Sequence, residues 1–263
     1  MLKFLNKYIL FSLFIIFHHL SVAQSVSASE LKFSPFALYE QGQENIYIDG
    51  VRTKYGLGVL GISVDTKLGG KFKLRTRLGY GYHPSARVSL TVEERQVAVT
   101  GPVSGFYIEG EAKYTFLDKP SYALTSELRY IIRNVDAPDL EGFAGSRAIT
   151  GTAVNDFDTL DLTLSAKLPV GQVAFVSLAA GLSEWHLKTT AVARSETGGS
   201  GSILCPCTYT KRINTFSKDP IFRILITSNN PQHNFDLEFY NRSLNSKAGT
   251  HIVGAELEYI FQF

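Results

Sequence analysis

Apolar and polar side chains alternate with a period of two over long stretches of the chain. From residue 71 to residue 82, every second side chain is apolar, aromatic or threonine, and the side chains between them are basic or glycine. The same alternation returns in 108–116, 160–168, 235–240 and 253–263. Successive side chains of a β-strand point to opposite faces, so these segments are predicted strands with one apolar face and one polar face.

Weaker runs raise the strand count to ten. They lie at about 30–40, 53–66, 121–133, 173–187 and 208–228. The composition agrees with an all-β domain, because 44% hydrophobic residues with only 19% charged residues suffice for a packed core, and Tyr, Phe and Gly are abundant.

Two kinds of connection alternate strictly along the chain. Short turns rich in Gly, Pro or Asn lie at 67–70, 118–121, 169–172 and 228–232, and longer connections lie at 41–52, 83–105, 134–156, 188–207 and 244–250. Short turns at one end and long loops at the other are typical of a closed antiparallel transmembrane β-barrel. We predict about ten strands. Twelve is a less favoured count, because the arms of segment 87–100 are too short to cross a bilayer and predict a hairpin above it; eight is also less favoured.

The N-terminus has the pattern of a secretory signal peptide. Lys3 and Lys7 precede a segment, 8–17, that is apolar apart from Ser12, and small residues lead up to Ala23. Ten residues of helix are about 15 Å long, too short for a membrane anchor. We therefore expect residues 1–23 to be removed, with a cleavage site as late as residue 28, and residues 24–263 to form a single barrel domain.

The mature chain is close to neutral. Without Lys3 and Lys7, 24 basic side chains remain beside 24 acidic ones. Nucleic-acid binding depends on a surplus of Lys and Arg that neutralises phosphates, so this function class is excluded.

Charged residues of opposite sign occupy the polar faces of the predicted strands. Charges packed inside a narrow barrel must be paired, because unpaired burial is strongly unfavourable. We expect a polar, salt-bridged lumen that conducts poorly, since a barrel of about ten strands lies near the filled end of the size range. The predicted lumen charge network comprises Lys73, Arg75, Arg77, Glu109, Glu111, Asp236, Glu238, Glu256 and Glu258.

The last strand resembles the C-terminal signature of bacterial outer-membrane β-barrel proteins. Leu257, Tyr259, Phe261 and Phe263 place alternate apolar or aromatic side chains on one face and end on Phe. The resemblance implies a Gram-negative source, recognition of this strand by the barrel-insertion machinery, and contact with outer-membrane lipid and lipopolysaccharide. It also implies extracellular loops and periplasmic termini. It indicates the architecture and no particular functional family within it.

Sequence motifs for chemistry are weak. The omptin proteases of the outer membrane use aspartate and histidine pairs at the outer rim, but His83 and His186 lack the matching aspartate neighbours. The lipid A deacylases use a serine, a histidine and an acid, and Ser183, Glu184 and His186 match that set only loosely. We assign no catalytic, cofactor or metal residues. Cys205 and Cys207 are a candidate disulfide in the predicted loop 188–207, because the periplasm is oxidising.

Two kinds of function remain open. The favoured one is non-enzymatic: a narrow porin-like channel, or a surface-binding or membrane-stabilising barrel. The alternative is a rim-located outer-membrane hydrolase, either an omptin-like protease or a lipid A-modifying enzyme, which would need His83, His186 or His251 to meet a carboxylate or serine near the outer end. The sequence indicates neither a solute nor an oligomeric state.

Deleting Phe263 should impair insertion, because the insertion machinery would lose the terminal aromatic residue of the signal. The measurement is the amount of folded barrel in outer-membrane fractions, read as the band that shifts on heating in SDS gels. A normal yield after the deletion would contradict the assembly role given to this strand.

Overall fold

The computed structural model describes residues 31–42, 46–48, 51–54, 56–68, 70–92, 95–144, 147–195, 208–230, 233–245 and 250–259. The predicted signal peptide, the candidate disulfide of Cys205 and Cys207, and the last two aromatic residues of the assembly signal, Phe261 and Phe263, lie outside these ranges. In the described part of the chain there is no helix that is long and apolar enough to span a membrane.

The described residues form twelve β-strands. Their bounds are β1 Leu31–Gly42, β2 Ile46–Ile48, β3 Val51–Lys54, β4 Gly56–Leu68, β5 Phe72–Val92, β6 Arg95–Lys119, β7 Tyr122–Ala144, β8 Arg147–Val170, β9 Ala174–Ser195, β10 Thr208–Asn230, β11 His233–Asn245 and β12 Thr250–Tyr259.

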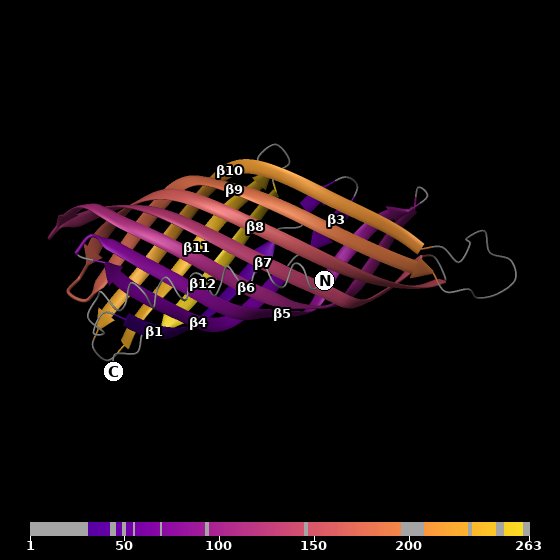
Figure 1. Cartoon of the computed structure of the whole chain (residues 1–263), viewed down its shortest axis with the longest axis horizontal. Helices are drawn as coiled ribbons and strands as arrows, with labels where there is room; N and C mark the ends of the chain where they lie inside the picture. The colour runs from indigo at the N-terminus through magenta and orange to yellow at the C-terminus, as the bar shows by residue number, and fades with distance from the viewer. Residues whose placement is uncertain are drawn as a thin grey trace, which may run out of the picture.

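Ten of these strands close into an antiparallel ring. Sequential neighbours pair from β4 through β12, and β1 pairs with β4 on one side and with β12 on the other. The closing ladder runs from Phe36 opposite Glu258 to Gly42 opposite Ile252. The prediction of an all-β, closed antiparallel barrel of ten strands is confirmed (Figure 1).

The predicted long loops are largely wrong. Residues 83–105, 134–156 and the first part of 188–207 instead continue the strands, so β5 to β10 are 21 to 25 residues long. The hairpin predicted over 87–100 is present as the outer ends of β5 and β6, which pair from Arg87 opposite Thr100 to Val92 opposite Arg95. The strands β1, β4, β11 and β12 have only 10 to 13 residues. The long strands therefore extend well past the short ones, as β9 and β10 show in Figure 1. We call the part of β5 to β10 beyond the short strands the projecting sheet.

An apolar belt surrounds the outside of the ring. On β8, the outward residues from Leu160 to Val170 are apolar, and the large ones among them are exposed. Ten residue steps at about 3.4 Å, tilted by about 40°, correspond to a height of about 26 Å, which matches the about 25 Å apolar band of a membrane barrel. Tyr114, Phe116 and Tyr122 are exposed near the short-turn ends of β6 and β7, and Tyr80 and Tyr82 are exposed in the middle of β5, as expected of aromatic residues at the two borders of the belt.

The belt ends sharply where the projecting sheet begins. The next outward residues are Asp158 on β8, Glu184 on β9 and Lys218 on β10. Glu184 and Lys218 form an exposed ion pair of 2.9 Å. These side chains require water, so they place the membrane boundary just beyond Leu160.

The two faces of the long strands exchange polarity at this boundary. Within the belt, β8 carries leucines outside and Asp161 and Thr163 inside, whereas beyond it Asp156 and Asp158 lie outside and Phe157 lies inside. Strands β7 and β9 change in the same way. The projecting sheet therefore has the arrangement of a water-soluble sheet, with its apolar face turned inward.

Among the described residues, one backbone edge of the projecting sheet has no pairing strand. Strand β10 pairs with β9 over its whole length from Thr208, but its pairing with β11 begins only at Ile221. Within the described residues, no strand pairs with the second edge of residues 208–220. Alternate N–H and C=O groups of this segment therefore point away from the sheet.

The belt assignment makes a directional prediction about charge on the outer face. Leu164→Arg should destabilise the folded barrel by about 2–4 kcal/mol, because it places a guanidinium near the middle of the apolar band. Thr152→Arg, on the outer face of the same strand in the projecting sheet, should cost less than about 0.5 kcal/mol. The measurement is urea unfolding in lipid vesicles, and equal effects of both substitutions would refute the boundary.

Candidate functional site: the barrel interior

A layer of buried ion pairs fills the part of the ring inside the belt. At its centre, Arg77 Nη1 lies 2.9 Å from Glu109 Oε1, and Arg77 Nη2 lies 2.6 Å from Glu258 Oε2. Glu256 is a third partner of Arg77. These four side chains are at most 3% exposed. Three strands, β5, β6 and β12, thus meet at one guanidinium.

Arg129 extends this layer across the ring. Its guanidinium lies 2.9 Å from Glu111 on β6 and 2.8 Å from Glu238 on β11. Glu238 is 109 residues away in sequence, so the contact crosses the interior. Arg75 lies 2.7 Å from Asp65 and 3.3 Å from Asp236, and Lys73 lies 3.0 Å from Asp65.

All nine residues of the proposed charge network lie on the inner face of the ring in ion pairs. Eight are buried, and the side chain of Lys73 is 30% exposed. Sequence reasoning missed a further set of inward charges, most of which lie at the ends of predicted strands or in the weaker runs. This set comprises Glu40, Asp65, Lys113, Glu127, Arg129, Arg133, Asp161, Asp219, Arg223 and Arg242.

The last ionic contacts before the projecting sheet involve Arg133 and Arg242. Arg133 forms a two-contact ion pair with Glu40, which also accepts a hydrogen bond from the hydroxyl of Tyr240, and both charged side chains are 0% exposed. Arg242 donates to Asp161 at 2.5 Å and to Ser183 at 3.0 Å.

Apolar side chains fill much of the interior beyond these ion pairs. The expectation of a polar interior throughout is therefore wrong, because the inner face becomes apolar where the outer face meets water. The buried apolar residues contributed by the projecting sheet include Val99, Val103, Val135, Ala137, Leu140, Ile149, Ala153, Phe157, Trp185, Ala191 and Ala193.

Arg133 joins the two layers of the interior. Its guanidinium carbon lies 5.6 Å from the centroid of Tyr107 and 5.2 Å from that of Phe157, so the cation packs on two aromatic rings. Tyr107 in turn donates a hydrogen bond to Glu109. On the neighbouring strand β12, Gly254 makes room for the ring of Tyr240, because a Cβ at this position would lie 2.1 Å from that ring.

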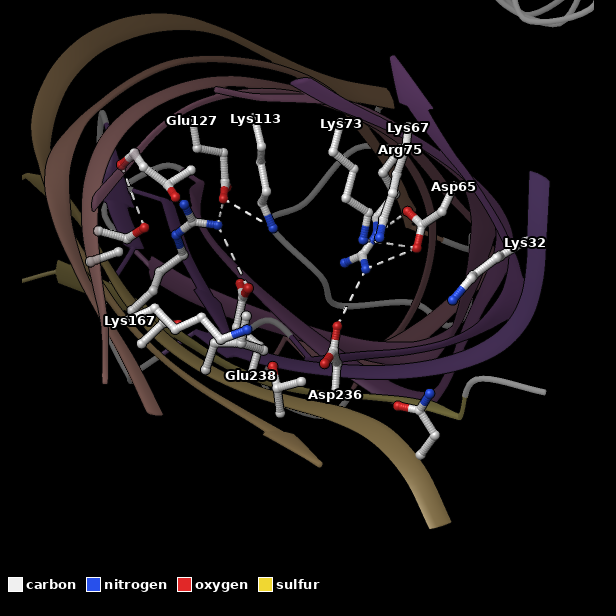
Figure 2. Close-up of a pocket in the computed structure, with 18 residues that line it drawn as sticks. Lys32, Asp65, Lys67, Lys73, Arg75, Lys113, Glu127, Lys167, Asp236 and Glu238 are labelled. Atoms are coloured by element: carbon white, nitrogen blue, oxygen red, sulfur yellow. Dashed lines mark hydrogen bonds and ion pairs between the residues drawn. The ribbon is translucent and has the colours of Figure 1, made fainter. Parts of the chain in front are cut away.

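A cavity of about 520 Å³ opens at the short-turn end of the ring. We call it the vestibule (Figure 2). Its lining includes seven cationic and four anionic side chains contributed by β1, β4 to β8, β10 and β11. The charged members are Lys32, Asp65, Lys67, Lys73, Arg75, Lys113, Glu127, Lys167, Arg223, Asp236 and Glu238. The vestibule ends against the ion pairs of Arg75, Arg129 and Arg223.

The residues considered for a hydrolytic site do not converge. Ser183 faces inward and bonds Arg242, whereas Glu184 pairs with Lys218 on the outer face and the His186 ring contacts Asn214 at 2.5 Å. The Nδ1 atom of His83 accepts a hydrogen bond from the Ser85 backbone at 3.2 Å. The side chain of His251 lies outside the described part. Within that part, no three His, Cys, Asp or Glu side chains are grouped closely enough to hold a metal.

No protein-family model matches the chain, and no curated protein matches its sequence. Among solved structures, the translocator domain of the autotransporter NalP from Neisseria meningitidis is similar with a TM-score of 0.50 and 9% identity, over 98% of this chain and 98% of that one. The outer-membrane protease OmpT of Escherichia coli gives a TM-score of 0.45 at 10% identity, over 88% and 95% of the two chains. Ail, the attachment invasion locus protein of Yersinia pestis, gives 0.37 at 11%, over 89% and 99%.

At such low identity the likeness concerns the fold alone. The chain has the fold of a bacterial outer-membrane β-barrel, as its C-terminal pattern indicated.

Breaking the Glu40–Arg133 pair should destabilise the barrel strongly. Arg133→Met leaves a buried carboxylate without its main partner and should cost about 3–5 kcal/mol, whereas adding Glu40→Leu should recover part of the loss. Unfolding is followed by the fluorescence of Trp185, the only tryptophan in the chain.

The matched control is the exposed pair of Glu184 and Lys218. Glu184→Leu and Lys218→Met should show a coupling energy below about 1 kcal/mol. A coupling equally small for the buried pair would contradict the role given to Arg133.

Proposed function

We propose that this protein is a non-conducting outer-membrane barrel that binds a partner through its projecting sheet at the cell surface. Three features support a location in the outer membrane: the apolar belt with its aromatic borders, the barrel fold, and the C-terminal strand. In this proposal, lipopolysaccharide and outer-membrane lipid contact the belt, and the barrel-insertion machinery recognises β12, the strand that carries Leu257 and Tyr259.

The interior argues against a solute channel. A water-filled path along the axis would have to pass the layer of Arg77, Glu109, Glu40 and Arg133, and the side chains of these residues are at most 1% exposed. Beyond this layer the apolar core of the projecting sheet replaces the ionic interior. Moving ions through either layer would require breaking buried pairs or wetting an apolar core, and both are costly.

The observation that carries the proposal is the free edge of residues 208–220 in the projecting sheet. A second chain in extended conformation can add to such an edge through backbone hydrogen bonds, a recurring mode of peptide recognition. Residues 208–217 of the free edge lie beyond the membrane boundary at Lys218, where a water-soluble partner reaches them. A hydrolytic function receives no comparable support. His186 lies opposite Asp158 on the outer face of β8 and β9, but no ion pair joins these two described residues, and Ser183 faces the other side of the sheet.

The first experiment measures conductance and orientation. The refolded mature protein should be silent in a planar bilayer while keeping its heat-modifiable band, and discrete, reproducible openings would overturn the non-conducting assignment. For orientation, Cys205 and Cys207 are replaced by serine, and single cysteines are placed at Asp139→Cys in the projecting sheet or at Gln172→Cys in a short turn.

Labelling with a membrane-impermeant maleimide then separates the two ends of the barrel. On intact cells, Asp139→Cys should react, and Gln172→Cys should react only after the outer membrane is permeabilised. The reverse pattern would place the projecting sheet in the periplasm and refute a cell-surface role.

The binding step is tested with a peptide that carries the sequence of residues 185–195. This segment pairs with the other edge of β10 in the folded sheet, so its side chains are compatible with that strand. The barrel in lipid nanodiscs should bind the peptide. Methylating every second amide nitrogen of the peptide should abolish binding when these are the N–H groups that point toward β10. Methylating the other set, which points away from β10, should preserve binding. Binding that is unchanged by either methylation pattern would show that the peptide does not bind by strand addition.

A further inference from the structure

The carboxylates of the vestibule are all engaged by cations of the ionic layer. Asp65 is held by Arg75 and Lys73, and Asp236 lies 3.3 Å from Arg75. Glu238 lies 2.8 Å from Arg129. Glu127 lies 3.1 Å from Lys113 and also pairs with Arg223. Each of these four acids thus already has at least one cationic partner within 3.3 Å.

Three lysines of the vestibule remain without a carboxylate partner among the described residues. They are Lys32 on β1, Lys67 on β4 and Lys167 on β8. In Figure 2, Lys32 and Lys67 lie on one side of the cavity and Lys167 lies on the other. The ammonium of Lys167 lies 3.9 Å from the centroid of the Phe175 ring, which holds its stem beside the mouth.

The three lysines line a concave cavity that is open at the short-turn end of the ring, rather than a flat surface. A concave site with low-dielectric walls concentrates the field of its charges, so like charges around a cavity attract a counter-ion more strongly than the same charges spread over a surface. Lysine is a compact point charge that suits phosphate groups. A volume of about 520 Å³ accommodates a small phosphorylated compound.

We propose that the vestibule is a binding site for small, soluble, multivalent anions that carry phosphate groups, held by Lys32, Lys67 and Lys167. The ligand is soluble because the lining side chains face the axis of the ring, whereas lipid headgroups lie against its outer side. The ligand stays in the vestibule, since the ion pairs of Arg75 and Arg129 close its inner end.

The test uses inorganic pyrophosphate as the probe and the folded mature barrel in zwitterionic nanodiscs. Titration calorimetry should show one site, with an affinity that falls as salt rises. Lys67→Gln and Lys167→Gln should each weaken binding about fivefold, a factor that corresponds to about 1 kcal/mol. The triple variant with Lys32→Gln added should lose measurable binding.

The matched control is Lys188→Gln, which removes an exposed lysine on the outer face of β9 in the projecting sheet. It should leave pyrophosphate affinity unchanged. Equal weakening by Lys188→Gln and Lys167→Gln would show non-specific attraction and overturn the site, as would the absence of binding by the unmodified barrel at low salt. Heat modifiability checks that each variant is folded. The vestibule and the projecting sheet lie at opposite ends, so this test and the peptide test fail independently.

Discussion

The hydrogen bonding of the backbone determines where this sheet is closed and where it is open. In hydrocarbon, an unpaired N–H or C=O group finds no water, so a sheet that spans a membrane must have no edge. The ladder between β1 and β12 removes the last edge of the ring. Strand β10 loses its second partner only from Pro220 outward, and Lys218 on the same strand already marks the aqueous side. The free edge therefore exists only where water can satisfy it, and this same edge is available for a partner strand.

The change of surroundings along each long strand also explains the two layers of the interior. Inside the belt the outer face must be apolar, so polar residues of the alternating pattern turn inward, where each charge needs a partner because burial without one is costly. Beyond the belt the outer face meets water, and the apolar residues turn inward to form a core. Arg133 lies at the junction, paired with Glu40 on one side and packed on Phe157 on the other. Beyond the vestibule, the interior is thus filled by two chemically different layers that share one backbone.

The sequence predicted the ring well and the projecting sheet poorly, for one physical reason. Alternation in 71–82 or 160–168 shows a strand whichever face is buried. In 134–156, by contrast, the exchange of polarity between the faces puts Asp136 and Asp156 on the outer face, near glycine and proline in the sequence, and this pattern resembles a polar loop. Those strands can be recognised in the sequence only if the alternation is followed past the point where the apolar and polar faces exchange. The partners of the inner charges were beyond the sequence, since Glu40 and Arg133 are 93 residues apart and meet only through the stagger of the closed ring.

The arrangement separates the two ends of the barrel. The vestibule lies against the charged layer, and the projecting sheet rests on its apolar core, so two layers of buried side chains separate a ligand at one end from the other end. Moving Arg133 would break its pair with Glu40 and uncover the rings of Tyr107 and Phe157 at once. A close-packed interior with such linked contacts favours a single arrangement over two. In the proposed function, the ring acts as a rigid support that holds the edge of β10 in a fixed position for strand addition, while the lysines of the vestibule lie at the other end of the barrel.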